Sequence, residues 1–88
     1  MIEKEFVVAN KLGLHARPAA LFVHAASKFK SAVVVTKDGL EINGKSVMGL
    51  MLLAAECGSK LKIRADGPDE KQAVEELSKL FSRKFDEE

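Results

Sequence analysis

Hydrophobic and polar residues alternate in two separate stretches of the chain, residues 2–8 and residues 60–65. Alternation with a period of two predicts β-strands that bury one face. Between them, two short apolar runs within residues 31–44 flank Asp38-Gly39, a dipeptide typical of a two-residue hairpin turn. The pattern therefore predicts four strands, with the middle two joined as a hairpin.

The apolar positions change to helical spacing after residue 15 and again after residue 46. The first predicted helix runs from Ala16 to about Lys28. The second is short, capped by Ser46 and stopped at Gly58, since Ser is a good N-cap and Gly a common C-terminal stop. The first helix is expected to bury a stripe made of Ala19, Phe22, Val23, Ala26 and Phe29.

A third helix is predicted after the turn at residues 66–68. Asp69 stands at its N-cap, and Gln72 occupies the capping-box position three residues later. Its apolar stripe is expected to comprise Val74, Leu77, Phe81 and Phe85.

The resulting βαββαβα order predicts one α+β domain over residues 1–88. Four strands with the three helices on one face form an open-faced β-sandwich. The other face of the sheet is expected to be polar, because charged residues occupy its positions. They include Glu3, Glu5, Lys62 and Arg64.

Composition narrows the class of protein. The chain is 47% hydrophobic and 31% charged with a net charge of +1, which is typical of a globular domain. The mixed charges argue against a nucleic-acid or membrane surface. No signal-peptide core or membrane-spanning run is evident, so we expect a cytoplasmic protein. The single cysteine, Cys57, has no partner for a disulfide or a metal site, and no metal or cofactor is expected.

The segment LGLHARPAA, residues 12–20, starts the first helix in an unusual way. Helices usually begin after Ser, Thr, Asp or Asn, but here the residue is His15. The first N–H groups of a helix lack partners and its dipole is positive there, so this end binds phosphate readily. Pro18 suits the first turn because its missing N–H is not needed. The amides of Ala16 and Arg17 then remain free.

These residue types together favour phosphoryl chemistry. Gly13 lets the chain turn sharply into the helix. The positive helix end favours a neutral imidazole, which is a competent nucleophile, and the Arg17 guanidinium can bind phosphate oxygens directionally. The pattern predicts that His15 carries a phosphoryl group held by Arg17 and the amide of Ala16, with Gly13 and Pro18 supporting the helix start. The alternative from the residues alone is that His15 and Arg17 are solvated surface residues.

Two motifs resemble those of one family. KLGLHARPAALFV, residues 11–23, resembles the active-site segment of HPr, the histidine-containing phosphocarrier of the bacterial phosphoenolpyruvate-dependent sugar phosphotransferase system (PTS). Residues 43–70, NGKSVMGLMLLAAECGSKLKIRADGPDE, resemble the family's second signature around a regulatory serine. The resemblance spans essentially the whole chain. It implies a four-stranded antiparallel sheet covered by three helices.

The resemblance also implies the function. His15 would accept a phosphoryl group on Nδ1 from phosphorylated Enzyme I and pass it to the IIA component of a sugar permease. Arg17 matches the arginine that contacts the phosphate. Ser46 matches the serine modified by HPr kinase/phosphorylase, which links the carrier to a catabolite regulator. A monomeric carrier with no stand-alone enzyme activity is expected.

A carrier must dock transiently on several partners, so an exposed apolar patch beside His15 is expected. The methionines suit such a surface because they adapt to different partners. Ordinary core packing is the alternative for the methionines, and a solvated position is the alternative for His24. The predicted docking residues are Ala20, Leu21, His24, Val47, Met48, Gly49 and Met51.

Ser46 has two interpretations, a plain N-cap or a regulatory phosphorylation site. Leu52 and the acidic segment LFSRKFDEE depart from many sugar-branch members and favour the nitrogen-branch phosphocarrier as an alternative. A module that acts only through phosphoserine is a second alternative, which the His15–Arg17 pair disfavours. A nucleic-acid-binding α+β domain ranks below both, since the sheet lacks aromatic residues.

Overall fold

The predicted order of strands and helices is confirmed. The computed structural model describes residues 1–87, and its strands and helices follow one another in the βαββαβα order that the periodicity indicated. One additional 3₁₀ turn, η1, follows the last helix. The elements are β1 (Ile2–Val7), α1 (Ala16–Ala26), β2 (Ala32–Lys37), β3 (Leu40–Asn43), α2 (Val47–Leu52), β4 (Lys60–Asp66), α3 (Glu70–Ser82) and η1 (Lys84–Asp86).

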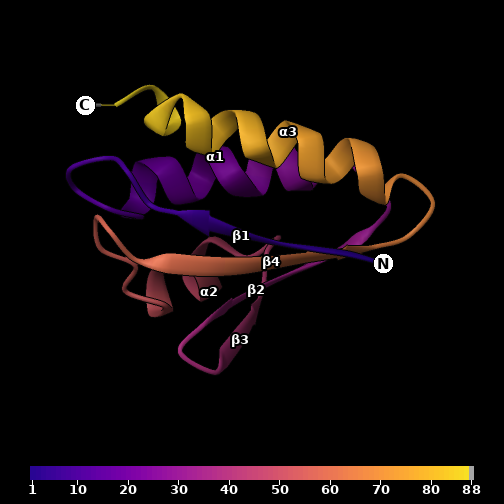
Figure 1. The fold of residues 1–88 in the computed structure, drawn as a ribbon, viewed down its shortest axis with the longest axis horizontal. Helices are drawn as coiled ribbons and strands as arrows, with labels where there is room; N and C mark the ends of the chain where they lie inside the picture. Colours follow the sequence, from indigo (N-terminus) through magenta and orange to yellow (C-terminus); the bar gives the residue numbers. More distant parts are fainter. Residues whose placement is uncertain (88) are drawn as a thin grey trace.

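The four strands form one antiparallel sheet in the order β1-β4-β2-β3 (Figure 1). The β2–β3 hairpin turns at Asp38 and Gly39, whose φ angles are 50° and 83°. Two consecutive positive φ angles are characteristic of the type I′ turn, whose twist matches that of the flanking strands. The hairpin signal in the sequence therefore specified both the turn and the pairing of Lys37 with Leu40.

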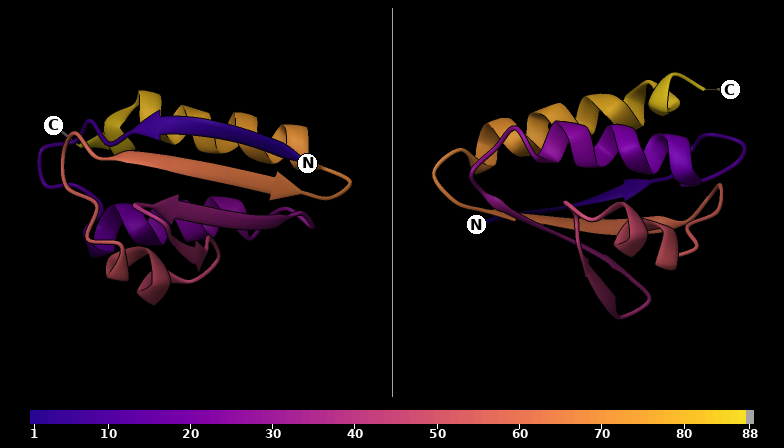
Figure 2. Two further views of the ribbon diagram at one scale, coloured as in Figure 1. Left: turned by 60° about the horizontal axis from the view of Figure 1, so that its bottom comes forward. Right: turned by 180° about the vertical axis from the view of Figure 1, so that it is seen from behind.

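The core lies between the sheet and the helices. Figure 2 shows α1 and α3 side by side behind the strands, and both helices bury an apolar stripe against them. Packing of this kind supplies most of the stability of a short amphipathic helix. The largest fully buried apolar side chains are Phe22, Phe85, Leu50, Leu61, Ile63 and Leu77.

The opposite face of the sheet is polar, as predicted. Glu3 lies directly across from Arg64, and Glu5 lies across from Lys62. Opposite charges in such cross-strand pairs stabilise a sheet modestly. Val7 and Val34 are apolar exceptions: half of the Val7 surface is exposed, and Val34 lies directly across from Arg64.

The second helix is shorter than predicted. It ends at Leu52, six residues before the expected stop at Gly58. Ala54 takes a positive φ of 49°, and the Lys37 Nζ atom donates to the carbonyl oxygens of Leu53 (3.1 Å) and Ala54 (3.3 Å). The helix end is thus closed by a side chain from β2, which no local sequence pattern reveals.

The start of α3 also differs from the prediction. Asp69 stands at the N-cap, but its carboxylate makes no bond to its own helix. It accepts hydrogen bonds from the backbone N–H of Lys30 and from both the N–H and the hydroxyl of buried Ser31. Gln72 forms no capping-box bond within residues 1–87; instead, the Glu70 carboxylate accepts a hydrogen bond from the Gly67 N–H at 3.1 Å.

The third helix ends at Ser82, and the chain then reverses through a left-handed turn. Lys84, Phe85 and Asp86 have φ angles of 53°, 54° and 58°. This conformation costs about 1–2 kcal/mol per non-glycine residue. Complete burial of the Phe85 ring, edge-on to Phe81 at 5.0 Å, offsets part of that cost. Phe85 therefore joins the core as predicted, but through this turn rather than on a continuing helix.

Asp69 should make stability depend on acidity. Its hydrogen bonds, first that from the Ser31 hydroxyl, lower the pKa of the Asp69 carboxyl to about 2. A carboxyl with a depressed pKa stabilises the fold fully above its unfolded pKa of about 4, and that contribution is lost as the pH falls toward 2. Urea unfolding between pH 6 and pH 2.5 should show Asp69→Ala less stable at pH 6, with the difference from the unmodified protein shrinking on acidification. Asp66→Ala, which removes an exposed carboxylate, is the matched control. A constant difference for Asp69→Ala across the range would contradict the prediction.

Candidate functional site

The site is centred on His15, which is the N-cap residue of α1. Its backbone is extended (φ −76°, ψ −174°), and its side chain makes no capping bond. The approaching loop turns at Gly13, whose φ is +71°. The N–H of Leu14 then donates to the carbonyl of Ala55 at 2.8 Å, which ties the loop to the segment after α2. Backbone contacts, rather than a conventional cap, therefore fix the imidazole at the helix start.

The first turn of α1 presents free hydrogen-bond donors. Pro18 has no N–H, and the Ala19 N–H already donates to the His15 carbonyl at 3.0 Å. Within residues 1–87, the amides of Ala16 and Arg17 meet no acceptor, and the first turn contains no acidic residue. An open, positively polarised helix end thus lies beside the imidazole, as the sequence predicted.

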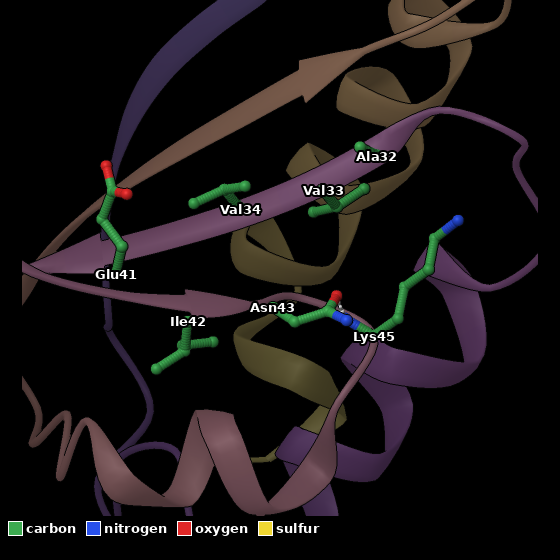
Figure 3. Close-up of a pocket in the computed structure, with 7 residues that line it drawn as sticks. All are labelled: Ala32, Val33, Val34, Glu41, Ile42, Asn43 and Lys45. Carbon is green, nitrogen blue, oxygen red and sulfur yellow. Dashed lines mark hydrogen bonds between the residues drawn. The ribbon is translucent and has the colours of Figure 1, made fainter.

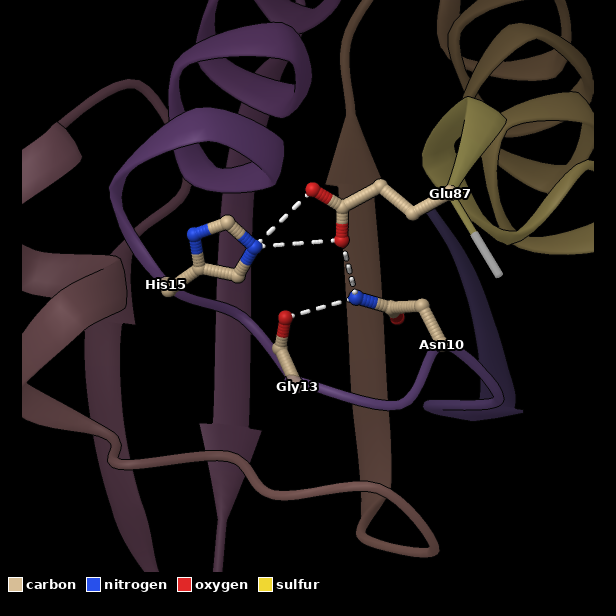
Figure 4. A network of polar contacts seen from close by, with 4 residues as sticks. All are labelled: Asn10, Gly13, His15 and Glu87. Atoms are coloured by element: carbon tan, nitrogen blue, oxygen red, sulfur yellow. Dashed lines mark hydrogen bonds and ion pairs between the residues drawn. The ribbon is translucent and has the colours of Figure 1, made fainter.

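A carboxylate that the sequence analysis missed holds the other side of the ring. His15 Nε2 lies 2.9 Å and 3.1 Å from the two carboxylate oxygens of Glu87 (Figure 4). The His15 side chain is 37% exposed, whereas that of Glu87 is only 12% exposed. The figure shows Nδ1 on the edge of the ring that faces away from Glu87. Nδ1 is therefore the nitrogen left for an incoming group.

Asn10 supports this contact from a fully buried position. Its Nδ2 donates to the Gly13 carbonyl at 2.6 Å and to Glu87 Oε1 at 3.0 Å (Figure 4). Its Oδ1 has no hydrogen-bond partner among the described residues. Asn10 thus joins the loop that carries His15 to the carboxylate that binds it.

The charge of Glu87 is stabilised where it lies. Burial disfavours ionisation, but hydrogen bonds from His15 and Asn10, together with the nearby charges of His15 and Arg17, outweigh it. The net result is that the pKa of the Glu87 carboxyl lies below its ordinary value. Glu87 is therefore an anion near neutral pH and acts only as a hydrogen-bond acceptor.

Sequence reasoning had little means of finding Asn10 and Glu87. They are separated by 77 residues, and Glu87 and His15 by 72. The sequence does show that residues 80–88 are rich in acidic side chains. It does not show the left-handed turn at residues 84–86, which directs one of these carboxylates to the imidazole.

The surface around His15 agrees in part with the predicted docking patch. On α1, Arg17, Ala20 and His24 are exposed, but Leu21 is half-buried and packs against the core. The expectation that Leu21 stands free on the surface is therefore wrong. The reason is that α1 also contacts α2 and α3, which widens its buried face beyond the stripe read from the sequence.

The α2 helix contributes the more exposed part of the predicted docking patch. Met48 is 78% exposed, Met51 47% and Leu52 73%. Val47 was expected to face outward with them, but it is half-buried and packs against the core. Gly49 is half-buried, and a β-carbon there would lie 3.3 Å from both the Ile42 β-carbon and the Ser46 hydroxyl. Methionines and Leu52, rather than Val47, form the outer surface.

Ser46 is the N-cap of α2, as predicted from the sequence. Its hydroxyl accepts a hydrogen bond from the Gly49 N–H at 3.0 Å. The side chain is half-buried. A charge added at this position would therefore appear at the N-terminal end of α2, the helix that carries the exposed Met48 and Met51.

A hollow of about 230 Å³ adjoins His15, lined also by Leu12, Leu14, Ala54, Ala55 and Glu56. A larger hollow, about 440 Å³, lies elsewhere, where β2 and β3 separate (Figure 3). It is lined by valines, Ile42, Glu41, Asn43 and Lys45 and, unlike the smaller hollow, contains no histidine. The smaller, open hollow is therefore the one associated with candidate chemistry.

No group of three or more His, Cys, Asp or Glu side chains is arranged to hold a metal ion among residues 1–87. None of the helices in that range combines the length and apolar character needed to cross a membrane. Cys57 is exposed, and its thiol lies 3.7 Å from the Ala9 carbonyl oxygen.

The whole chain is similar to known phosphocarrier proteins. The family model described as "PTS HPr component phosphorylation site" matches residues 2–83. Phosphocarrier protein HPr of Treponema pallidum is 48% identical over 88 residues, which is all of both chains. The crystal structure of HPr-C-His from Thermoanaerobacter tengcongensis is 49% identical, with a TM-score of 0.96 over 100% of this chain and 99% of that one. The structure titled as an HPr dimer from the same organism is 48% identical, covers 97% and 98%, and has a TM-score of 0.78.

Gly13 should be essential to the shape of the loop. An alanine there would have both an unfavourable positive φ and a β-carbon that runs into the Ala55 carbonyl oxygen and lies 2.9 Å from the Glu56 α-carbon. Gly39 has a similar φ of +83° with open space around it, so Gly39→Ala isolates the backbone cost. We expect Gly39→Ala to cost about 1 kcal/mol and Gly13→Ala about 2–4 kcal/mol in urea unfolding. Equal losses for the two variants would show that the close approach at Gly13 is unimportant.

Proposed function

The chain belongs to the PTS HPr family of phosphocarrier proteins, and we propose that His15 is the residue that carries the phosphoryl group. The function that follows from the family is phosphoryl transfer within the phosphotransferase system. The observation that supports His15 is the position of its Nδ1 atom. One edge of the imidazole is bound by Glu87, and the other edge lies free beside an uncapped helix start.

The proposed transfer needs no metal and no general base from this chain. The Nδ1 lone pair attacks phosphorus, and the N–P bond forms as the bond to the donor's leaving atom breaks. The electron pair of that bond stays with the donor. The free amides of Ala16 and Arg17 and the guanidinium of Arg17 would hold the phosphate oxygens by charge-assisted hydrogen bonds. Return transfer reverses these steps, with the N–P electron pair returning to Nδ1.

An open site suits a carrier rather than an enzyme with its own substrate pocket. The phosphoryl group must remain accessible to the next acceptor, and His15 is more than one-third exposed. Two amides and one arginine at a helix end would hold the group without enclosing it. Each partner would then supply the remaining transition-state contacts.

Family membership implies interaction with PTS components such as Enzyme I and IIA domains. We propose that Enzyme I is the donor and a sugar-specific IIA component the acceptor for this chain. The exposed methionines and Leu52 of α2, with Ala20 and His24 of α1, would form the docking surface, while Leu21, Val47 and Gly49 would support it from half-buried positions.

We also propose that the carrier acts as a monomer in the cytoplasm. Light scattering tests the first point, because a solved relative is titled as a dimer.

We further propose that Ser46 is a regulatory phosphorylation site. A phosphate at a helix N-terminus is favourable, so the modification would leave α2 in place. It would add about two negative charges beside the docking surface and weaken binding of an acidic partner. HPr kinase/phosphorylase and a catabolite regulator are the proposed partners of this modified form.

His15→Ala should abolish phosphoryl transfer. Incubation with phosphoenolpyruvate and Enzyme I should label the unmodified protein with an acid-labile, base-stable phosphoryl adduct. The His15→Ala variant should carry no detectable label, whereas His24→Ala should be labelled normally because His24 lacks the helix-end geometry. Label retained in His15→Ala, or no label in the unmodified protein, would refute the assignment.

Ser46→Ala should have two separable effects. Loss of the hydrogen bond to Gly49 should lower the free energy of unfolding by about 1 kcal/mol, measured in urea. The same substitution should remove an acid-stable label introduced by ATP and HPr kinase/phosphorylase. Ser59→Ala is the comparison, since Ser59 lies outside any helix cap. An acid-stable label that persists in Ser46→Ala would place the modification elsewhere.

A further inference from the structure

We propose that Glu87 is a positioning residue that keeps a proton on His15 Nε2 both before and after phosphorylation. Nδ1 then carries the lone pair in the free carrier, and the phosphorylated ring remains protonated at Nε2, ready to leave as neutral imidazole. This inference rests on the proposed role of His15. It explains in addition why the imidazole adopts the reactive tautomer and why the phosphorylated ring is labile.

The direction of the hydrogen bond follows from the groups that meet. Asn10 has its amide nitrogen between the Gly13 carbonyl oxygen and Glu87 Oε1, and both of these atoms only accept hydrogen bonds. The nitrogen is therefore correctly placed, and it donates to the carboxylate. Because ionised Glu87 can only accept, the 2.9 Å contact requires His15 Nε2 to be the donor. In a neutral imidazole this leaves Nδ1 without a proton.

The carboxylate is held in place rather than merely present nearby. The fully buried Phe85 ring anchors the residues immediately before Glu87, and three left-handed residues turn the chain toward α1. The Glu87 side chain is 12% exposed and bonded by both Asn10 and His15. An orienting partner on the second nitrogen of a reactive histidine is the usual means of selecting its tautomer.

The contact also matters after transfer. When Nδ1 attacks phosphorus, the ring still carries the Nε2 proton and gains one positive charge. Glu87 balances that charge on the side opposite the phosphoryl group. When the N–P bond later breaks, its electron pair returns to Nδ1 and a neutral imidazole is released. No proton has to move in either direction.

Other charged groups surround the ring but do not make this contact. Arg17 lies on α1 and lowers the pKa of Glu87 through its charge. Glu56, from the loop after α2, lines the same hollow as His15 but forms no hydrogen bond with it in residues 1–87. Asp86 is exposed and pairs with Arg83 at 3.3 Å. Asp86→Asn therefore removes the same charge one residue away without touching His15, and it is the matched control.

The first test uses the free carrier and needs no partner protein. Imidazole ¹⁵N NMR at pH 8 should show a protonated Nε2 and an unprotonated Nδ1 in the unmodified protein and in Asp86→Asn. In Glu87→Ala the two nitrogen shifts should move toward each other, since the tautomer is no longer selected. Backbone amide spectra report whether the fold is retained. Unchanged imidazole shifts in a folded Glu87→Ala variant would overturn the tautomer role.

The second test uses the adduct formed with Enzyme I and phosphoenolpyruvate. The pH at which the phosphorylated protein changes from labile to stable should fall by about one unit or more in Glu87→Gln and Glu87→Ala, because an opposite charge no longer retains the Nε2 proton. At a fixed pH within that interval, hydrolysis should be about tenfold slower. Asp86→Asn should behave as the unmodified protein. An unchanged profile would overturn the role in the phosphorylated state. Failure to form any adduct would instead refute the carrier function, while the NMR result would stand by itself.

Discussion

The site depends on a helix start that has no cap of its own. Residues at the beginning of α1 leave two backbone amides free, and no acidic side chain in the first turn neutralises the helix dipole. Such an end is unfavourable unless an anion or water occupies it. The bond from Leu14 to Ala55 and the turn at Gly13 keep the loop in place while the donors stay open. The rest of the molecule stabilises this arrangement, and the helix end stays open to a ligand of the kind proposed above.

The imidazole is consequently held between two electrostatically different environments. On one edge is the positive helix end with Arg17, and on the other is the partly buried carboxylate of Glu87. A doubly negative phosphoryl group is favoured on the first side and disfavoured on the second. Because of this asymmetry the two ring nitrogens are in different surroundings. In a solvated histidine, both nitrogens would face water.

The proposed docking surface follows a similar division between fixed and adaptable parts. Leu50 is fully buried and fixes α2 on the sheet, while Met48 and Leu52 on its outer side are more than 70% exposed. The helix is only six residues long, so packing rather than helix propensity holds it. A rigid base with flexible side chains suits transient binding to more than one partner.

The sequence by itself determined the order of strands and helices, the hairpin at Asp38-Gly39, and the placement of His15 at a helix start. These features follow from local periodicity, turn chemistry and two motifs, all of which act over a few residues. Other features were decided by tertiary structure. Lys37 ends α2 early, and Asp69 binds Ser31 instead of its own helix. Glu87 reaches His15 across 72 residues, through a left-handed turn stabilised by burial of Phe85. Such long-range hydrogen bonds depend on where packing brings distant segments together, and no local pattern encodes that.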